Sequence, residues 1–303
     1  MKVVFLAALK AGYETVKHVA ESRKDEIHVF TLDSNHSGRS GYVPFDDLEG
    51  KCKLYKIEPK DDSWHNKIKN LNPEVIFVIG WSFIIPQEII SAAKHGAIGQ
   101  HPTLLPKHRG NAPIPWTLIN GLTRTGVSLF YLTDEADAGD IVAQSEIEVL
   151  FEDDAASLYN KMIETTKKLF VETLDKIENN SLEPWAQDAE KASKWPKRKP
   201  EDGIIDWDVA SINIYNWIRG LTHPYPGAFT FLENKKIFIW KSSPGPDASS
   251  GKPGEIMDTA SKILVKAGDG SVYLEKLQIE GEEELSAEDF VKKYGLVKGV
   301  ILG

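Results

Sequence analysis

The feature that most constrains this fold is an alternation of short apolar runs with segments of helical period. The apolar runs are Val3 to Ala8, Ile27 to Leu32 and Val75 to Ile79, and Tyr13 to Ser22 has the helical period. Continuous apolar runs separated by helices are typical of parallel strands that are buried on both faces. We therefore predict an α/β fold with a Rossmann-like, mostly parallel sheet covered by helices on both faces.

A change of composition predicts a second domain. Residues 192–203, ASKWPKRKPEDG, combine proline and charge without a regular apolar period. Beyond them, 227–242 and 262–281 read as two antiparallel hairpins that turn at 233–235 and at 268–270. We place an N-terminal domain at 1–191, a linker at 192–203 and a small β domain at 204–303.

Charge and cysteine content argue against several classes of protein. The net charge of −9 disfavours nucleic-acid binding through a broad basic face. Cys52 has no cysteine to pair with, so we expect no disulfide, no cysteine-based metal site and a reducing, cytoplasmic setting. The first apolar run leads into a helical pattern, and no run approaches the roughly 20 apolar residues of a membrane span. We predict no membrane segment.

Several well-known catalytic motifs are absent from the chain. No G-x-G-x-x-G follows the first apolar run, which argues against a nicotinamide enzyme. The sequence also has no P-loop, no H-E-x-x-H and no G-x-S-x-G elbow. We predict no metal site.

Two residues offer acid–base chemistry. His101 follows a strand predicted at 97–99, and Pro102 makes its loop rigid. Asp137 lies between two alanines in the stretch 134–144. In open α/β sheets ligands bind beyond the carboxyl ends of strands, and a carboxylate beside a histidine orients the imidazole and favours its protonated form. Taken alone, a histidine there is more often structural, an aspartate more often a turn residue, and the basic run 107–109 equally a solvated face.

The stretch 101–144, HPTLLPKHRGNAPIPWTLINGLTRTGVSLFYLTDEADAGDIVAQ, resembles the core signature of the folate-dependent formyltransferases. In that family H-x-S/T-L-L-P-x-x-R-G is followed by A-P-x-x-W, T-G-V and A-D-A-G-x-I-x-A-Q. The C-terminal segments resemble the OB-type β-barrel that follows the catalytic domain in this family. The resemblance therefore implies a formyltransferase fold, with 1–191 as catalytic domain and 204–303 as a small OB-like barrel.

The resemblance also implies the substrates and the site. The donor would be 10-formyltetrahydrofolate and the acceptor an amine, with His101 catalytic and Asp137 holding it and assisting proton transfer. The implied donor-binding residues are Trp81, Ser82, Phe83, Ile84, Ile85, Ala136 and Asp137. The implied acceptor-binding residues are Gln100, Thr103, Lys107, His108, Arg109 and Gly110. As side chains, Trp81, Phe83 and Ile85 are equally well explained as core or loop anchors.

The chain departs from the family at Gly99. The family has N-x-H, whose asparagine amide donates to the developing oxyanion, and this chain has Gly99-Gln100-His101. Losing one oxyanion donor costs roughly two to three orders of magnitude in rate. Another residue or a water supplies the donor, Gln100 swings in, or the site is degenerate. The hydrolase domain of formyltetrahydrofolate dehydrogenase resembles this chain and also lacks the asparagine.

The acceptor is predicted from charge. The linker has a short basic run, Lys194 and Lys197 to Lys199, but residues 252–303 are net acidic and include EGEEE at 280–284, which disfavours tRNA. We predict a nucleotide-linked amino sugar as acceptor, in surface-polysaccharide or glycan synthesis, with no nucleic-acid partner and a possible homodimer. The alternatives are a methionyl-tRNA formyltransferase, a formyltetrahydrofolate hydrolase and a non-catalytic folate-binding module.

Overall fold

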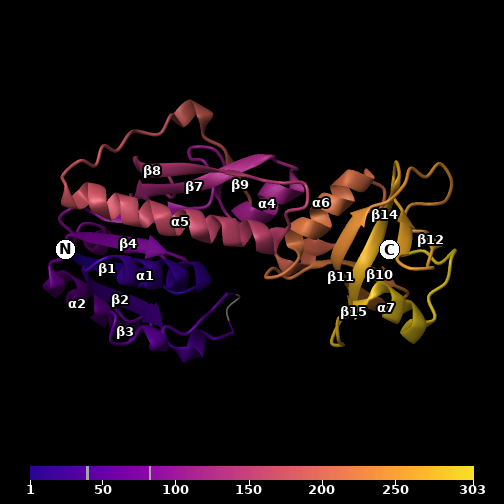
Figure 1. The fold of residues 1–303 in the computed structure, drawn as a ribbon, viewed down its shortest axis with the longest axis horizontal. Helices are drawn as coiled ribbons and strands as arrows, with labels where there is room; N and C mark the ends of the chain where they lie inside the picture. Colours follow the sequence, from indigo (N-terminus) through magenta and orange to yellow (C-terminus); the bar gives the residue numbers. More distant parts are fainter. Residues whose placement is uncertain (39–40, 82) are drawn as a thin grey trace. The chain divides into compact units, whose positions relative to one another are not determined.

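The computed structural model describes residues 1–38, 41–81 and 83–303. It divides into two compact units, each made of several stretches of chain (Figure 1). The first unit comprises Met1–Pro113, Arg124–Glu148 and Asn160–Pro196; the second comprises Ile114–Thr123, Val149–Tyr159 and Lys197–Gly303. The domain boundaries at 191 and 204 stay a prediction.

Within the described residues, a seven-stranded sheet forms the centre of the first unit. Its strands are β1 (Lys2–Ala7), β2 (Glu26–Leu32), β3 (Lys53–Ile57), β4 (Val75–Ile79), β5 (Ala97–His101), β7 (Arg124–Tyr131) and β8 (Ile141–Glu148). Their order is β3-β2-β1-β4-β5-β7-β8. The strands from β3 to β5 pair in parallel, and β7 and β8 continue the sheet antiparallel. The Rossmann-like, mostly parallel sheet is confirmed.

Helices cover both faces of this sheet. The helices of the described chain are α1 (Lys10–Ser22), α2 (Ser63–Leu71), α3 (Gln87–Ile90), α4 (Pro113–Ile119), α5 (Ala155–Glu178), α6 (Ser211–Leu221) and α7 (Ala287–Tyr294). Phe5 of β1 stacks against Phe170 of α5 with ring centroids 6.1 Å apart. Val4 and Leu6 instead belong to a buried cluster with Trp64 of α2. Because successive strand residues point to opposite faces, α5 and α2 lie on opposite sides of the sheet.

The topology places the carboxyl ends of β4 and β5 together. These strands pair in parallel, so Ile79 and His101 end at the same edge of the sheet. The strand order also reverses between β1 and β4, where open α/β sheets bind ligands. A two-residue pairing, β6 (Arg109–Gly110) with β9 (Lys194–Trp195), lies in the same unit.

The second unit contains a curled antiparallel sheet. Its strands are β10 (Ala228–Leu232), β11 (Lys235–Pro244), β12 (Ile256–Asp258), β13 (Ile263–Lys266), β14 (Ser271–Ile279) and β15 (Leu285–Ser286). The order is β10-β11-β14-β13-β12, with β15 on β14. Register shifts between β11 and β14 near Lys241 bend the sheet. Ile214 and Ile218 of α6 pack into its apolar core with Ile237 and Ile239. This confirms a small barrel-like β domain after the α/β sheet.

Across the described ranges, every helix is too short or too polar to cross a lipid bilayer.

Candidate active site

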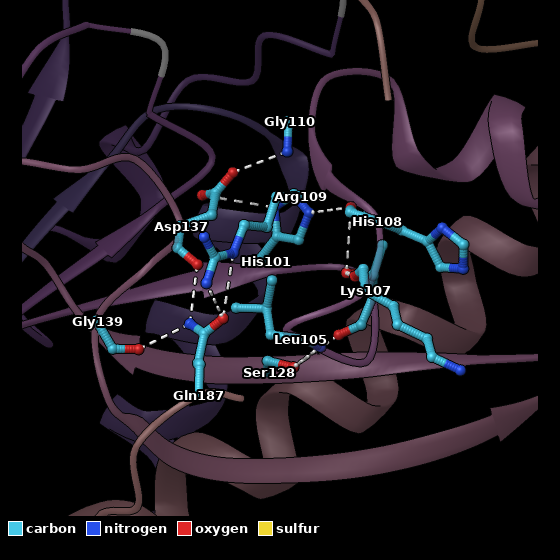
Figure 2. Close-up of polar contacts among 11 residues, drawn as sticks. His101, Leu105, Lys107, His108, Arg109, Gly110, Ser128, Asp137, Gly139 and Gln187 are labelled. Atoms are coloured by element: carbon cyan, nitrogen blue, oxygen red, sulfur yellow. Dashed lines mark hydrogen bonds and ion pairs between the residues drawn. The ribbon is translucent and has the colours of Figure 1, made fainter. Parts of the chain in front are cut away.

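His101 is the last residue of β5 and is buried, with 6% of its surface exposed. As placed, its Nε2–H donates to the backbone carbonyl of His108, 2.9 Å away (Figure 2). The loop that presents this carbonyl is held from within, because the Thr103 hydroxyl donates to the Lys107 carbonyl at 3.0 Å. A histidine whose Nε2 donates to a carbonyl presents Nδ1 to the site.

Asp137 lies on the loop after β7 and faces that nitrogen. Its Oδ1 is 3.8 Å from His101 Nδ1, and its Oδ2 accepts a hydrogen bond of 2.9 Å from the Gly110 amide. The residue has φ of 58°, in the left-handed region that few non-glycine residues adopt. Figure 2 shows His101 and Asp137 brought together from segments far apart in the sequence. The structure thus brings the two predicted acid–base residues together.

A glutamine that the sequence did not single out supports this arrangement. The Gln187 amide donates to the carbonyls of Asp137 and Gly139 at 2.8 and 2.7 Å. Its Oε1 accepts from Nε and Nη2 of Arg109 at 3.2 and 2.8 Å. Gln187 lies in a stretch with no regular period, so one sequence carries no signal for it.

A pocket of about 580 Å³ opens on one side of Asp137. Among the predicted donor-binding residues, Trp81, Phe83, Ile84, Ile85, Ala136 and Asp137 line it, and Ser82 lies outside the described residues. Trp81 and Ile85 also pack on the buried cluster of the sheet, so they serve as core and as pocket wall. Ile84 is 94% exposed. In the described chain, the buried Trp81 Nε1–H has no hydrogen-bond partner.

A second pocket of about 440 Å³ also borders Asp137. Arg109, Gly110 and Lys194 line it, and the two pockets share residues 135–137. Of the other residues predicted to bind the acceptor, Gln100 lines the first pocket, whereas Thr103, Lys107 and His108 line neither. Thr103 is fully buried and bonds to its own loop. Asp137 therefore borders both cavities, whereas His101 lines neither of them.

His108 stacks on Trp195 with ring centroids 4.1 Å apart. Burial, helped by Lys107 and His101 nearby, lowers the pKa of His108 below its ordinary value, so the ring is neutral at pH 7. Its predicted role in binding the acceptor stays a prediction.

The side chains around Gly99 leave no space for a larger residue at this position. A Cβ there would lie 2.7 Å from Leu132 Cδ2 and 3.2 Å from Phe130 Cζ. Apolar side chains thus fill the position from which the family's asparagine projects.

Among the described residues, no cluster of three histidine, cysteine or carboxylate side chains is arranged to hold a metal ion.

Known proteins match this chain along its whole length. Residues 1–174 match the family Formyl transferase, and residues 197–295 match Formyl transferase, C-terminal domain. A methionyl-tRNA formyltransferase of Geobacter metallireducens is 38% identical over 100% of this chain and 99% of its own. A methionyl-tRNA formyltransferase of Alkaliphilus oremlandii is 31% identical over 100% of both chains.

Solved structures share the fold. HypX from Aquifex aeolicus, in complex with tetrahydrofolic acid, matches with a TM-score of 0.69 and 19% identity, over 97% of this chain and 47% of HypX. An N-formyltransferase from Helicobacter canadensis, in complex with folinic acid and dTDP-3-aminofucose, matches with a TM-score of 0.70 and 16% identity, over 90% of this chain and 98% of that one.

The predicted amino-sugar acceptor, and with it the exclusion of nucleic acid, is wrong. The curated relatives that align over the full chain at 30–38% identity are methionyl-tRNA formyltransferases. The acidic run at 280–284 does not by itself exclude tRNA, because lysines lie next to it in the structure. Lys236 pairs with Glu280, Lys276 with Glu284 and Lys293 with Glu282, so the acidic run is largely neutralised where it lies. Net charge also says nothing of where local basic surface gathers.

The matched families, together with relatives that align from end to end, show that this chain belongs to the formyltransferase family.

Proposed function

We propose that this protein is a methionyl-tRNA formyltransferase, which transfers the formyl group of 10-formyltetrahydrofolate to the α-amino group of methionine on tRNA. The donor is the one that this family uses. The observation that carries the proposal is the pairing of His101 with Asp137, which borders two pockets, in a chain whose full-length relatives are methionyl-tRNA formyltransferases. Such a substrate places the protein in the cytoplasm, where tRNA is charged.

The two pockets suit two substrates. The pocket lined by Trp81 and Phe83 offers aromatic and aliphatic side chains with polar groups beside them, which suits a flat, polar-edged ring such as a pteridine. The pocket lined by Arg109 and Lys194 brings two cationic side chains to an anionic acceptor end, beside the carboxylates of Glu135 and Asp137. Residues 135–137 border both, so a formyl group and an amine would meet beside Asp137.

Formyl transfer to an amine requires stabilisation of a developing negative charge and transfer of a proton. The acceptor amine attacks the formyl carbon, and negative charge develops on the formyl oxygen. His101, oriented by Asp137 and by the His108 carbonyl, stabilises that charge. Asp137 takes the proton that leaves the attacking nitrogen and returns it to the folate N10 as the bond between N10 and the formyl carbon breaks. The products are formyl-methionyl-tRNA and tetrahydrofolate in equal amounts.

The test is an assay with 10-formyltetrahydrofolate and methionyl-tRNA that measures formylated tRNA, tetrahydrofolate and free formate in parallel. We expect equal amounts of the first two and no formate, and we expect His101→Ala to abolish turnover. Formate without formylated tRNA would identify a hydrolase. Donor binding with no turnover of any kind would identify a binding module, and either result overturns the proposal.

A further inference from the structure

We propose that residues 187–195, which we call the strap, are a positioning element that sets the relative geometry of His101 and Asp137, with Gln187 as its principal residue. The inference rests on the proposed function only in assigning the reaction to His101 and Asp137. Gln187 touches neither the His101 imidazole nor the Asp137 carboxylate, although Lys194 of the strap lines the second pocket. The strap holds the backbone on which both catalytic side chains depend.

Gln187 uses both ends of its amide, and only glutamine chemistry fits. Arg109 has only donors, so Oε1 must face it, and the carbonyls of Asp137 and Gly139 only accept, so the NH₂ group must face them. A glutamate at 187 would keep the contact with Arg109 but would place an oxygen against two carbonyl oxygens. A methionine would lose all four contacts while keeping the length of the side chain.

Gln187 holds a loop whose backbone conformation is unfavourable by itself. Asp137 adopts a left-handed backbone, which persists only where the surroundings impose it. Gly139 is pressed against β7, since a Cβ there would lie 1.9 Å from the Tyr131 carbonyl oxygen. With its two carbonyls tied to one amide, the loop points the Asp137 carboxylate at His101 and at the Gly110 amide.

The other end of the strap holds the partner of His101. The Ser193 hydroxyl accepts from the His108 amide at 2.9 Å, and the Ser193 carbonyl accepts from the Arg109 amide at 2.8 Å. The Trp195 ring stacks on the His108 ring. His108 itself has φ of 63°, and its carbonyl receives the His101 Nε2–H.

Both ends of the strap act on the relative placement of His101 and Asp137. The direction of the His108 carbonyl fixes the proton on His101 Nε2, which leaves Nδ1 toward Asp137. The Gln187 end fixes where the carboxylate stands. A loosened strap would therefore slow the chemical step more than it weakens binding of the folate donor, because most of the donor pocket lies on other segments.

The decisive variants are Gln187→Glu and Gln187→Met, measured in the full-length protein. The matched control is Gln278→Glu in the second unit, where Gln278 accepts from Trp240 Nε1 and donates to the Glu282 carbonyl. We expect both Gln187 variants to lower kcat tenfold or more, with the KM for 10-formyltetrahydrofolate within twofold of wild type. Their melting temperatures should fall no further than that of the control, whose kcat stays near wild type. A kcat within twofold of wild type in Gln187→Glu, or an equal loss in the control, overturns the proposal.

A second measurement does not depend on the acceptor. ¹⁵N NMR of the histidine side chains should show a proton on Nε2 of His101 in the wild type. Ser193→Ala should weaken that signal through exchange, and Gln187→Glu should shift the Nδ1 resonance. A wild-type His101 without a proton on Nε2, or spectra unchanged in both variants, overturns the proposal. If the wild type failed to formylate methionyl-tRNA, the proposed function would fall and the NMR result alone would decide the role of the strap.

Discussion

The Nδ1 atom of His101 and the Oδ1 atom of Asp137 face each other across 3.8 Å, and each side chain is tied at its other polar atom. His101 Nε2 donates to the His108 carbonyl, and Asp137 Oδ2 accepts from the Gly110 amide. The gap is too long for a hydrogen bond but within the range of an ion pair. Catalytic contacts that are long without substrate commonly tighten when it binds. The two side chains are thus oriented toward each other, but no hydrogen bond joins them.

Asp137→Asn should nearly abolish turnover while leaving the fold intact. Asparagine also tolerates a left-handed backbone, and its carbonyl can still accept from the Gly110 amide. What disappears is the negative charge that takes the proton and orients His101, a loss of about 10²-fold or more in kcat. Steady-state kinetics and a melting curve check both parts. Wild-type kcat in this variant would remove Asp137 from the proposed chemistry.

The sequence predicted the strands that are buried on both faces, because burial makes them continuous apolar runs. The runs at 3–8, 27–32 and 75–79 became β1, β2 and β4. It gave no such signal for β3 at the edge of the sheet, whose residues KLYKI include the exposed Lys53 and Lys56. An edge strand is stabilised by its neighbour more than by its own apolar content.

The candidate site was predictable where motif residues act through side chains, and not where they act through the backbone. His101 and Asp137 came from a motif and meet as expected. Lys107 and His108 were expected to bind the acceptor, yet here the protein uses their carbonyls, which no residue type specifies. Gln187 lies 50 residues from Asp137 in the chain, so only the folded structure brings its amide to that loop.

Arg109→Lys should weaken use of the acceptor more than use of the donor. Lysine keeps the charge but loses the planar fork that gives two hydrogen bonds to Gln187. Hydrogen bonds to charged groups are worth about 1.5–3 kcal/mol, so kcat/KM for methionyl-tRNA should fall by about tenfold or more. Arg124→Lys is the matched control, because Arg124 is 72% exposed and pairs with Glu146 on the neighbouring strand. Equal kinetics in the two variants would argue against a role for Arg109 at the acceptor.

His108→Asn should change how stability depends on pH. Burial lowers the pKa of His108 in the folded protein, so the unfolded chain binds a proton there more readily. Protonation near and below pH 6.5 therefore favours unfolding, and stability rises with pH through that window. Asparagine suits the left-handed backbone at 108 and does not titrate. Melting temperatures from pH 5 to 7.5 should fall less steeply in the variant on acidification. Parallel curves would mean that His108 makes no such contribution.

Gly99→Asn tests whether the site lacks an oxyanion donor. The single variant should be less stable by about 1–3 kcal/mol, because its Cβ would lie 2.7 Å from Leu132 Cδ2 in a packed region. Leu132→Ala removes that obstacle, so the double variant should be more stable than the sum of the two single changes predicts. If an amide donor is what the site lacks, the double variant should also gain kcat over Leu132→Ala, by about tenfold or more. A double variant that regains stability without gaining rate would mean that the space beside Gly99 is not where the oxyanion forms, or that the oxyanion already has its donor from elsewhere.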